Sequence, residues 1–192
     1  MPSDTPPINL IVFAGFKRIA QGRTADVLAQ LRGHKDDDTP YLVFDEQTGE
    51  PLDFDVHNRA GAVTPAASAE AHDEAPRGVG RPRLGVVARE VTLLPRHWDW
   101  LNRQPGGASV ALRRLVQEAS RVNADRDAVR ASREATYRFM TAIAGALPGF
   151  EEATRALFAG EHERFEALID AWPADLRTHL QKLSAAGWST TA

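Results

Sequence analysis

The stretch VTLLPRHWDWLNRQPGGASVALRRLVQEASR, residues 91–121, decides how the middle of this chain folds. Its first residues predict a short extended segment. Pro95 then opens a helix, because proline lacks the N–H that the first turn of a helix leaves unpaired. This helix is expected over residues 95–104 and is broken by the Pro-Gly-Gly at 105–107. Ser109 can cap a second helix that fills the rest of the stretch. The predicted order is extended segment, helix, turn and helix.

The second predicted helix has one apolar face. At 3.6 residues per turn, the residues expected to point inward are Leu112, Leu115, Val116 and Ala119. Arg113 and Arg114 are expected on the outer face of the same helix. We therefore predict that Trp98 and Leu101, on the first helix, pack against this apolar face.

This order of elements resembles the ribbon-helix-helix group of bacterial DNA-binding proteins. The resemblance implies a homodimer in which the extended segments of two chains pair and enter the major groove of double-stranded DNA. The residues that would face the groove, counted back from Pro95, are Leu93, Val91 and Arg89. A shift by one residue would present Glu90 and Thr92 instead. Base edges are read by hydrogen-bonding side chains, and neither set of residues is well suited to reading them. The topology can therefore be shared while the sequence-reading function is absent or altered.

Arginines gather just ahead of the extended segment, in RGVGRPR at residues 77–83. Within it, Gly80-Arg81-Pro82 resembles the core of an AT-hook, which places arginines in the narrow minor groove of A·T-rich DNA. Val79 stands where that motif usually has a further arginine. The alternative is that these arginines are the basic end of a linker. The candidate nucleic-acid-binding residues of the chain are Arg77, Arg81, Arg83, Arg89, Arg96, Arg113 and Arg114.

The charges are distributed unevenly. The 192 residues carry a net charge of −3, but residues 77–138 hold 13 Arg and no Lys against 6 Asp/Glu, a net charge of +7. Residues 1–76 carry −7 and residues 139–192 carry −3. Such an asymmetry is typical of a polyanion-binding region, and equally of two modules that pair electrostatically within one chain.

The N-terminal part has the patterns of strands around one helix. INLIVF and FKRIAQ flank Ala14-Gly15 and predict a hairpin. A helix is expected over residues 25–32, and YLVFD (41–45) and PLDFDV (51–56) predict a second hairpin. The fold class is therefore α+β, with a small ββαββ domain over residues 1–57.

Three further domains follow from composition and periodicity. Residues 58–79 are rich in small residues without a periodic apolar face, so a flexible linker is expected there. Residues 80–122 form the basic, ribbon-helix-helix-like module. Residues 123–192 are expected to be a helical bundle that begins with a helix capped by Asn123. The shared core of this bundle is predicted to hold Phe150, Leu157, Phe158, Phe165, Leu168, Ile169, Trp172, Leu176, Leu180 and Leu183.

Over most of its length the sequence also resembles a bacterial family known only as domain of unknown function 2239. The resemblance is carried by GRPRLGVVAREVTLLPRHWDWLNRQPGGASVALRRLVQEASR (80–121), with AGFKRIAQG and VFDEQTGEPLDFDV ahead of it. It implies a bacterial, cytoplasmic protein and carries no particular activity.

The sequence offers little support for catalysis. Its six histidines are scattered, and it has neither a zinc-protease spacing nor a phosphate-binding glycine loop. The absence of Cys excludes disulfides, thiolate ligands and a thiol nucleophile. Asp53, Asp55 and His57 alternate along one predicted strand, which fits a solvent-facing strand surface better than a metal site. The N-terminus lacks the pattern of a signal peptide, and its apolar run is too short to span a membrane.

These observations lead to one expected function and one alternative. We expect a non-enzymatic, cytoplasmic, homodimeric DNA-binding regulator or accessory protein, with no cofactor, no metal and no membrane association. The alternative is a protein-interaction or self-assembly module that does not bind nucleic acid.

Overall fold

The structure is a computed structural model that describes residues 8–32, 40–53, 64–65, 87 and 89–188. The chain divides into two compact units. We call residues 1–68 together with 125–192 the first unit, and residues 69–124 the second unit.

The first unit contains an antiparallel sheet. Its elements in chain order are β1 (Asn9–Ala14), β2 (Lys17–Arg23), α1 (Thr24–Arg32), β3 (Tyr41–Asp45), β4 (Pro51–Asp53) and β5 (Thr64–Pro65). The strand order is β2-β1-β3-β4-β5, so β2 lies at one edge of the sheet. The predicted ββαββ order is confirmed, including the hairpin at Gly15, whose positive φ of 55° suits glycine.

β5 is a strand that the sequence did not predict. It lies within the segment expected to be a linker, and it pairs with β4. Its two residues carry no alternation from which a strand could be read. Apart from β5, the predicted linker at 58–79 lies outside the described residues.

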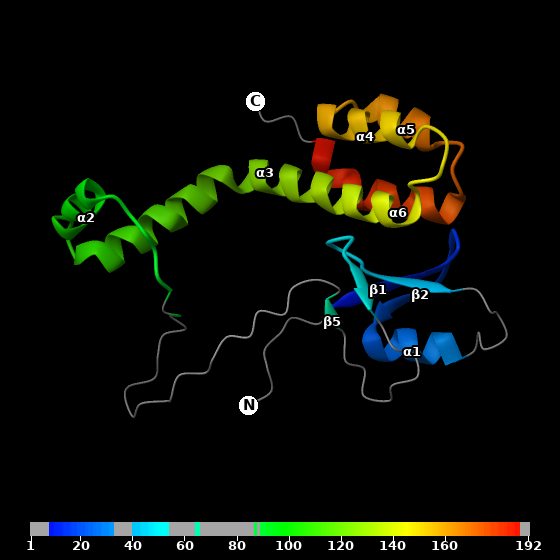
Figure 1. The fold of residues 1–192 in the computed structure, drawn as a ribbon, viewed down its shortest axis with the longest axis horizontal. Coiled ribbons are helices and arrows are strands. Elements are labelled where there is room, and N and C mark those ends of the chain that lie inside the picture. Colours follow the sequence, from blue (N-terminus) through cyan, green and yellow to red (C-terminus); the bar gives the residue numbers. More distant parts are fainter. Residues whose placement is uncertain (1–7, 33–39, 54–63, 66–86, 88, 189–192) are drawn as a thin grey trace. The chain divides into compact units, whose positions relative to one another are not determined.

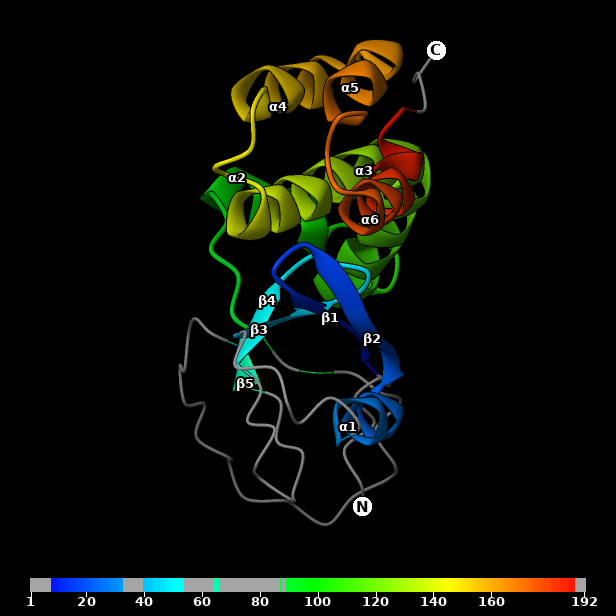
Figure 2. The same cartoon turned by 90° about the vertical axis from the view of Figure 1, so that its right-hand side faces the viewer.

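The two faces of the sheet are both covered, because the side chains of a strand alternate between its faces. Leu10 and Val12 of β1 pack with Val27 and Leu31 of α1. Their neighbours Ile11 and Phe13 join the buried cluster formed by the C-terminal helices. Figures 1 and 2 show the resulting layers of the first unit, with α1 on one side of the sheet and α3 and α6 on the other.

The C-terminal helices of the first unit are the end of α3 (Gly107–Ile143), α4 (Phe150–Ala159), α5 (His162–Ile169) and α6 (Ala174–Ser184), followed by a short 3-10 helix, η1 (Ala185–Trp188). Seven of the ten residues predicted to form their core are buried in one cluster: Leu157, Phe165, Ile169, Trp172, Leu176, Leu180 and Leu183. Phe150 and Leu168 are partly buried against it. Phe158 differs from the prediction, because its side chain is 48% exposed.

The sheet and these helices share one core, although the sequence predicted separate domains at 1–57 and 123–192. Phe139 of α3 contacts Phe13 of β1 and Phe44 of β3, with ring centroids 5.4 and 4.8 Å apart. Gly49 also lies close against α3: a Cβ built there would come within 2.2 Å of the Ala135 carbonyl oxygen. The physical reason is the continuous apolar run of β1, which requires cover on both faces of the sheet.

The second unit contains an extended segment, a short helix and the start of a long one. Leu94 has extended backbone angles and precedes α2 (Pro95–Asn102), with Pro95 at its start as predicted. After a turn, α3 begins at Gly107 rather than at the predicted cap Ser109.

α3 also continues through the predicted helix boundary at residues 121–123. Asn123 was expected to begin a new helix, but it lies inside α3, and its side-chain Nδ2 donates a hydrogen bond to the Ala119 carbonyl at 2.8 Å. The residues around it include no Gly or Pro that would end a helix. Among the described residues, no helix combines the length and the apolar composition that crossing a membrane requires.

Candidate interaction surface

Exposed apolar side chains are concentrated in the second unit. Among its described residues, the buried apolar residues are Leu101 and Ala111. The exposed large ones are Val87, Val91, Leu94, Trp98, Trp100, Val110, Leu115, Val116 and Val122. A unit that buries so little of its own apolar surface is poorly stabilised by its own contacts.

The apolar face of α3 accounts for much of this exposure, and here the sequence prediction is wrong. Leu115, Val116 and Ala119 were expected to point into a core with α2. Instead Leu115 is 44% and Val116 62% exposed, and every residue from 113 to 122 is exposed. α2 is only eight residues long and ends at Asn102, and the buried apolar residue of this part of α3 is Ala111, near the start of the helix. Of the two residues expected to pack against this face, Trp98 is 36% exposed and Leu101 is buried.

We call the residues Leu112, Leu115, Val116, Ala119 and Val122 the apolar seam of α3. At 100° per residue they occupy an arc of about 120° on the helix. The spacing of Leu112, Leu115, Ala119 and Val122 is alternately three and four residues, which is the spacing of helices that pack side by side. The seam is thus a continuous apolar stripe.

The arginines of α3 lie on the other side of the helix. Arg113, Arg114 and Arg121 fall on the arc opposite the apolar seam. Arg121 forms an ion pair with Glu118 at 2.8 Å, and the Arg113 Nε donates a hydrogen bond to the Ser109 carbonyl at 3.1 Å. Arg114 forms no ion pair with another described residue. This part of α3 therefore has an apolar side and a basic side.

The structure places four of the seven predicted DNA-binding arginines, all of them exposed. Arg89 lies in the extended segment, Arg96 in the first turn of α2, and Arg113 and Arg114 on α3. None of the four forms an ion pair with a described residue. Their guanidinium groups are open to solvent, but no contact among the described residues brings them together into one pocket. The other three predicted residues, Arg77, Arg81 and Arg83, lie outside the described residues.

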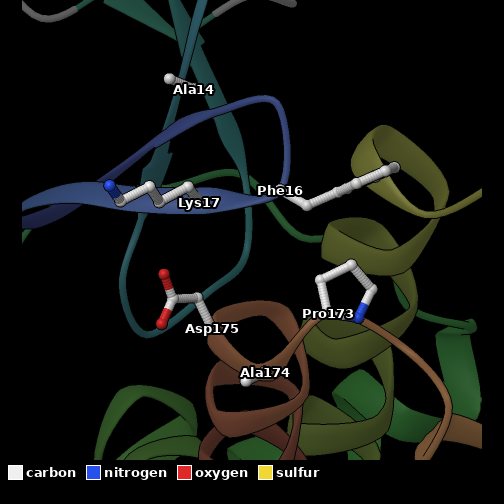
Figure 3. Close-up of a pocket in the computed structure, with 6 residues that line it drawn as sticks. All are labelled: Ala14, Phe16, Lys17, Pro173, Ala174 and Asp175. Carbon is white, nitrogen blue, oxygen red and sulfur yellow. The ribbon is translucent and has the colours of Figure 1, made fainter.

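The first unit has an open pocket of about 500 Å³ (Figure 3). It is lined by Ala14, Phe16 and Lys17 around the β1–β2 turn, and by Pro173, Ala174 and Asp175 at the start of α6. The Asp175 carboxylate accepts a hydrogen bond from the Arg18 backbone N–H at 3.0 Å, so it already has a structural role. Lys17 and Asp175 are the charged residues of its lining. The described residues also contain no group of three or more His, Asp or Glu that could hold a metal ion.

A buried polar cluster of the first unit was not anticipated from the sequence. Glu46 is buried and accepts hydrogen bonds from the side chains of Gln21 and Lys182. His179 lies nearby with its ring 4.6 Å from that of Phe139, and its Nε2 has no hydrogen-bond partner among the described residues. Burial lowers the pKa of His179 to about 4, which the nearby Glu46 carboxylate opposes and the Lys182 and Arg18 cations reinforce. The imidazole is enclosed by the core, which fits a structural role better than a catalytic one.

Comparison with known proteins gives one match, to a family model. Neither the curated proteins nor the solved structures include a match to this chain. A family model described as "Uncharacterized protein conserved in bacteria (DUF2239)" matches residues 9–184. Since this match covers nearly all of the 192 residues, the chain belongs to the DUF2239 family of bacterial proteins.

Proposed function

We propose that this chain is a non-enzymatic self-assembly protein of the bacterial cytoplasm, in which the second unit associates with a second copy through the apolar seam of α3. The observation that carries the proposal is the exposure of the seam. Its apolar side chains follow a helical period, as those of a packed helix do, yet no described part of the second unit covers them. Contiguous exposed apolar surface on a soluble protein is typical of an interaction site.

The free energy gained by burying the apolar seam supports self-association. Full burial of a Leu or Val side chain contributes about 1.5–3 kcal/mol. Leu115, Val116 and Val122 are each about half exposed or more, so covering them contributes about 1 kcal/mol per residue. Over two copies this amounts to about 6 kcal/mol, before any contribution from the tryptophans of α2 and before the cost of association. Association itself costs about 4 kcal/mol or more, so we expect a weak dimer whose mass depends on protein concentration.

The test is the mass of the protein in solution. We expect size-exclusion chromatography with light scattering to give twice the 21.0 kDa of one chain, falling towards one chain on dilution. Leu115→Glu places a charge in the seam and should give the mass of one chain. Gln117→Glu adds the same carboxylate on the opposite side of α3 and should leave the dimer intact. A wild-type protein with the mass of one chain at the highest attainable concentration would refute the proposal.

A second candidate function is binding of double-stranded DNA, and the exposure of Arg89, Arg96, Arg113 and Arg114 favours it. Arginines without acidic partners are available to phosphate oxygens. A dimer would double their number, as the resemblance to ribbon-helix-helix proteins implies. Residues 89–94 of two copies would then pair as a ribbon, which would bring Arg89 to the major groove. Fluorescence anisotropy with a labelled duplex tests this function, and absence of binding at low salt would exclude it.

A further inference from the structure

We propose that two copies of α3 pair in antiparallel orientation, with Leu115 of each copy against Ala119 of the other and with the twofold axis at the height of residue 117 along the helix. This inference rests on the proposed self-association and adds its geometry. It uses residues 112–122, which are described in the structure and belong to the second unit.

The first argument is the order of large and small residues along the apolar seam. Its three- and four-residue spacings place Leu112, Leu115, Ala119 and Val122 in successive layers. In the antiparallel register, Leu112 lies opposite Val122 and Leu115 opposite Ala119, so each layer combines a larger side chain with a smaller one. A parallel pair would place Leu115 against Leu115 and Ala119 against Ala119. The Leu115 layer would hold the helices further apart than the Ala119 layer can fill, and the resulting gap is unfavourable in a close-packed interior.

The second argument is the position of Val116. It lies at one edge of the apolar seam, and its side chain is 62% exposed. Because the proposed axis passes near residue 117, Val116 of one copy meets Val116 of the other, and both become buried. In a parallel pair the same side chains would lie on opposite flanks of the interface and would stay in contact with water.

Disulfide crosslinking distinguishes these arrangements, and the chain has no native Cys to interfere. Leu112→Cys and Val122→Cys are prepared as separate single variants, one with an affinity tag that separates the products by mass. They are mixed in equal amounts and oxidised, and the products are read on a non-reducing gel. A disulfide requires Cα atoms within about 7 Å, so we expect the mixed disulfide to exceed either homodisulfide by about tenfold. Gln117→Cys, whose side chain points away from the partner helix, serves as the control and should give little product.

The outcomes separate this inference from the proposed function. A preference for the two homodisulfides, in a protein that light scattering shows to be a dimer, would overturn the antiparallel register and leave self-association standing. Equal amounts of all three disulfides, no more than the Gln117→Cys control yields, would likewise overturn the register. A protein with the mass of one chain in light scattering would overturn both.

Discussion

Replacing Phe139 with alanine tests whether the sheet and the helices of the first unit fold as one. Phe139 is fully buried, and its ring lies 5.4 Å from Phe13 of β1, 4.8 Å from Phe44 of β3 and 4.6 Å from His179 of α6. The substitution removes a ring on which the sheet and two helices meet. We therefore expect the free energy of unfolding to fall by about 3–5 kcal/mol. For a chain of this length, the melting temperature should fall by roughly 6–20 °C.

The measurement is urea unfolding followed by circular dichroism, with Phe158→Ala as the matched control. Phe158 has the same side chain and lies on a helix of the same unit, but it is 48% exposed, and its ring contact is with Tyr137. We expect the control to cost about 1 kcal/mol. If Phe139→Ala costs no more than Phe158→Ala, the shared core between sheet and helices is refuted. Two separate unfolding transitions in the wild type, with only one shifted by Phe139→Ala, would also contradict it.

Two further predictions concern pH and salt. Because burial lowers the pKa of His179 from 6.5 to about 4, the folded state keeps the neutral ring, and stability is lost as the pH falls from about 6.5 towards 4. In urea unfolding across this range, the wild type should lose about 3 kcal/mol more than His179→Leu, and equal losses would argue against the lowered pKa. If Arg113 and Arg114 contact DNA phosphates, replacing both with alanine should lower the slope of log affinity against log salt by about two. An unchanged slope in fluorescence anisotropy would place these two residues outside the DNA interface.

The fold of this chain was predictable where local signals are strong. Pro95 has a fixed φ that suits the first turn of a helix, and Gly15 tolerates the positive φ that the tight turn requires. The start of α2 and the first hairpin could therefore be placed from the sequence. The helix start predicted at Asn123 was wrong, because a capping residue can also lie within a helix when its side chain bonds to the preceding turn. The core shared by the sheet and the C-terminal helices depends on contacts between residues far apart in the chain. The apolar run of β1 indicates that both faces of the sheet are covered, but it does not identify the covering element.

The candidate surface was recognised from the sequence but was assigned the wrong environment. Periodicity identifies the face of α3 that carries Leu112, Leu115 and Val116, and the structure has the same face. The periodicity does not indicate whether that face contacts the same chain, a second copy or water. The exposure of Leu115 and Val116 supplied this information. The buried contact between Glu46 and Lys182 had no signal in the sequence, because its partners lie 136 residues apart.

The edge strand β2 is a place where another molecule could associate with this chain by strand pairing. An unpaired strand edge can recruit a strand of another molecule and begin aggregation. Here the side-chain amide of Gln30 in α1 accepts a hydrogen bond from the Gln21 backbone N–H at 3.3 Å and donates one to the Gln21 carbonyl at 3.1 Å. The Asp175 carboxylate accepts a hydrogen bond from the Arg18 backbone N–H. These side chains stand where a foreign strand would have to bond. This edge of the sheet is thereby protected from pairing with a strand of another molecule. The association proposed for α3 does not involve this edge.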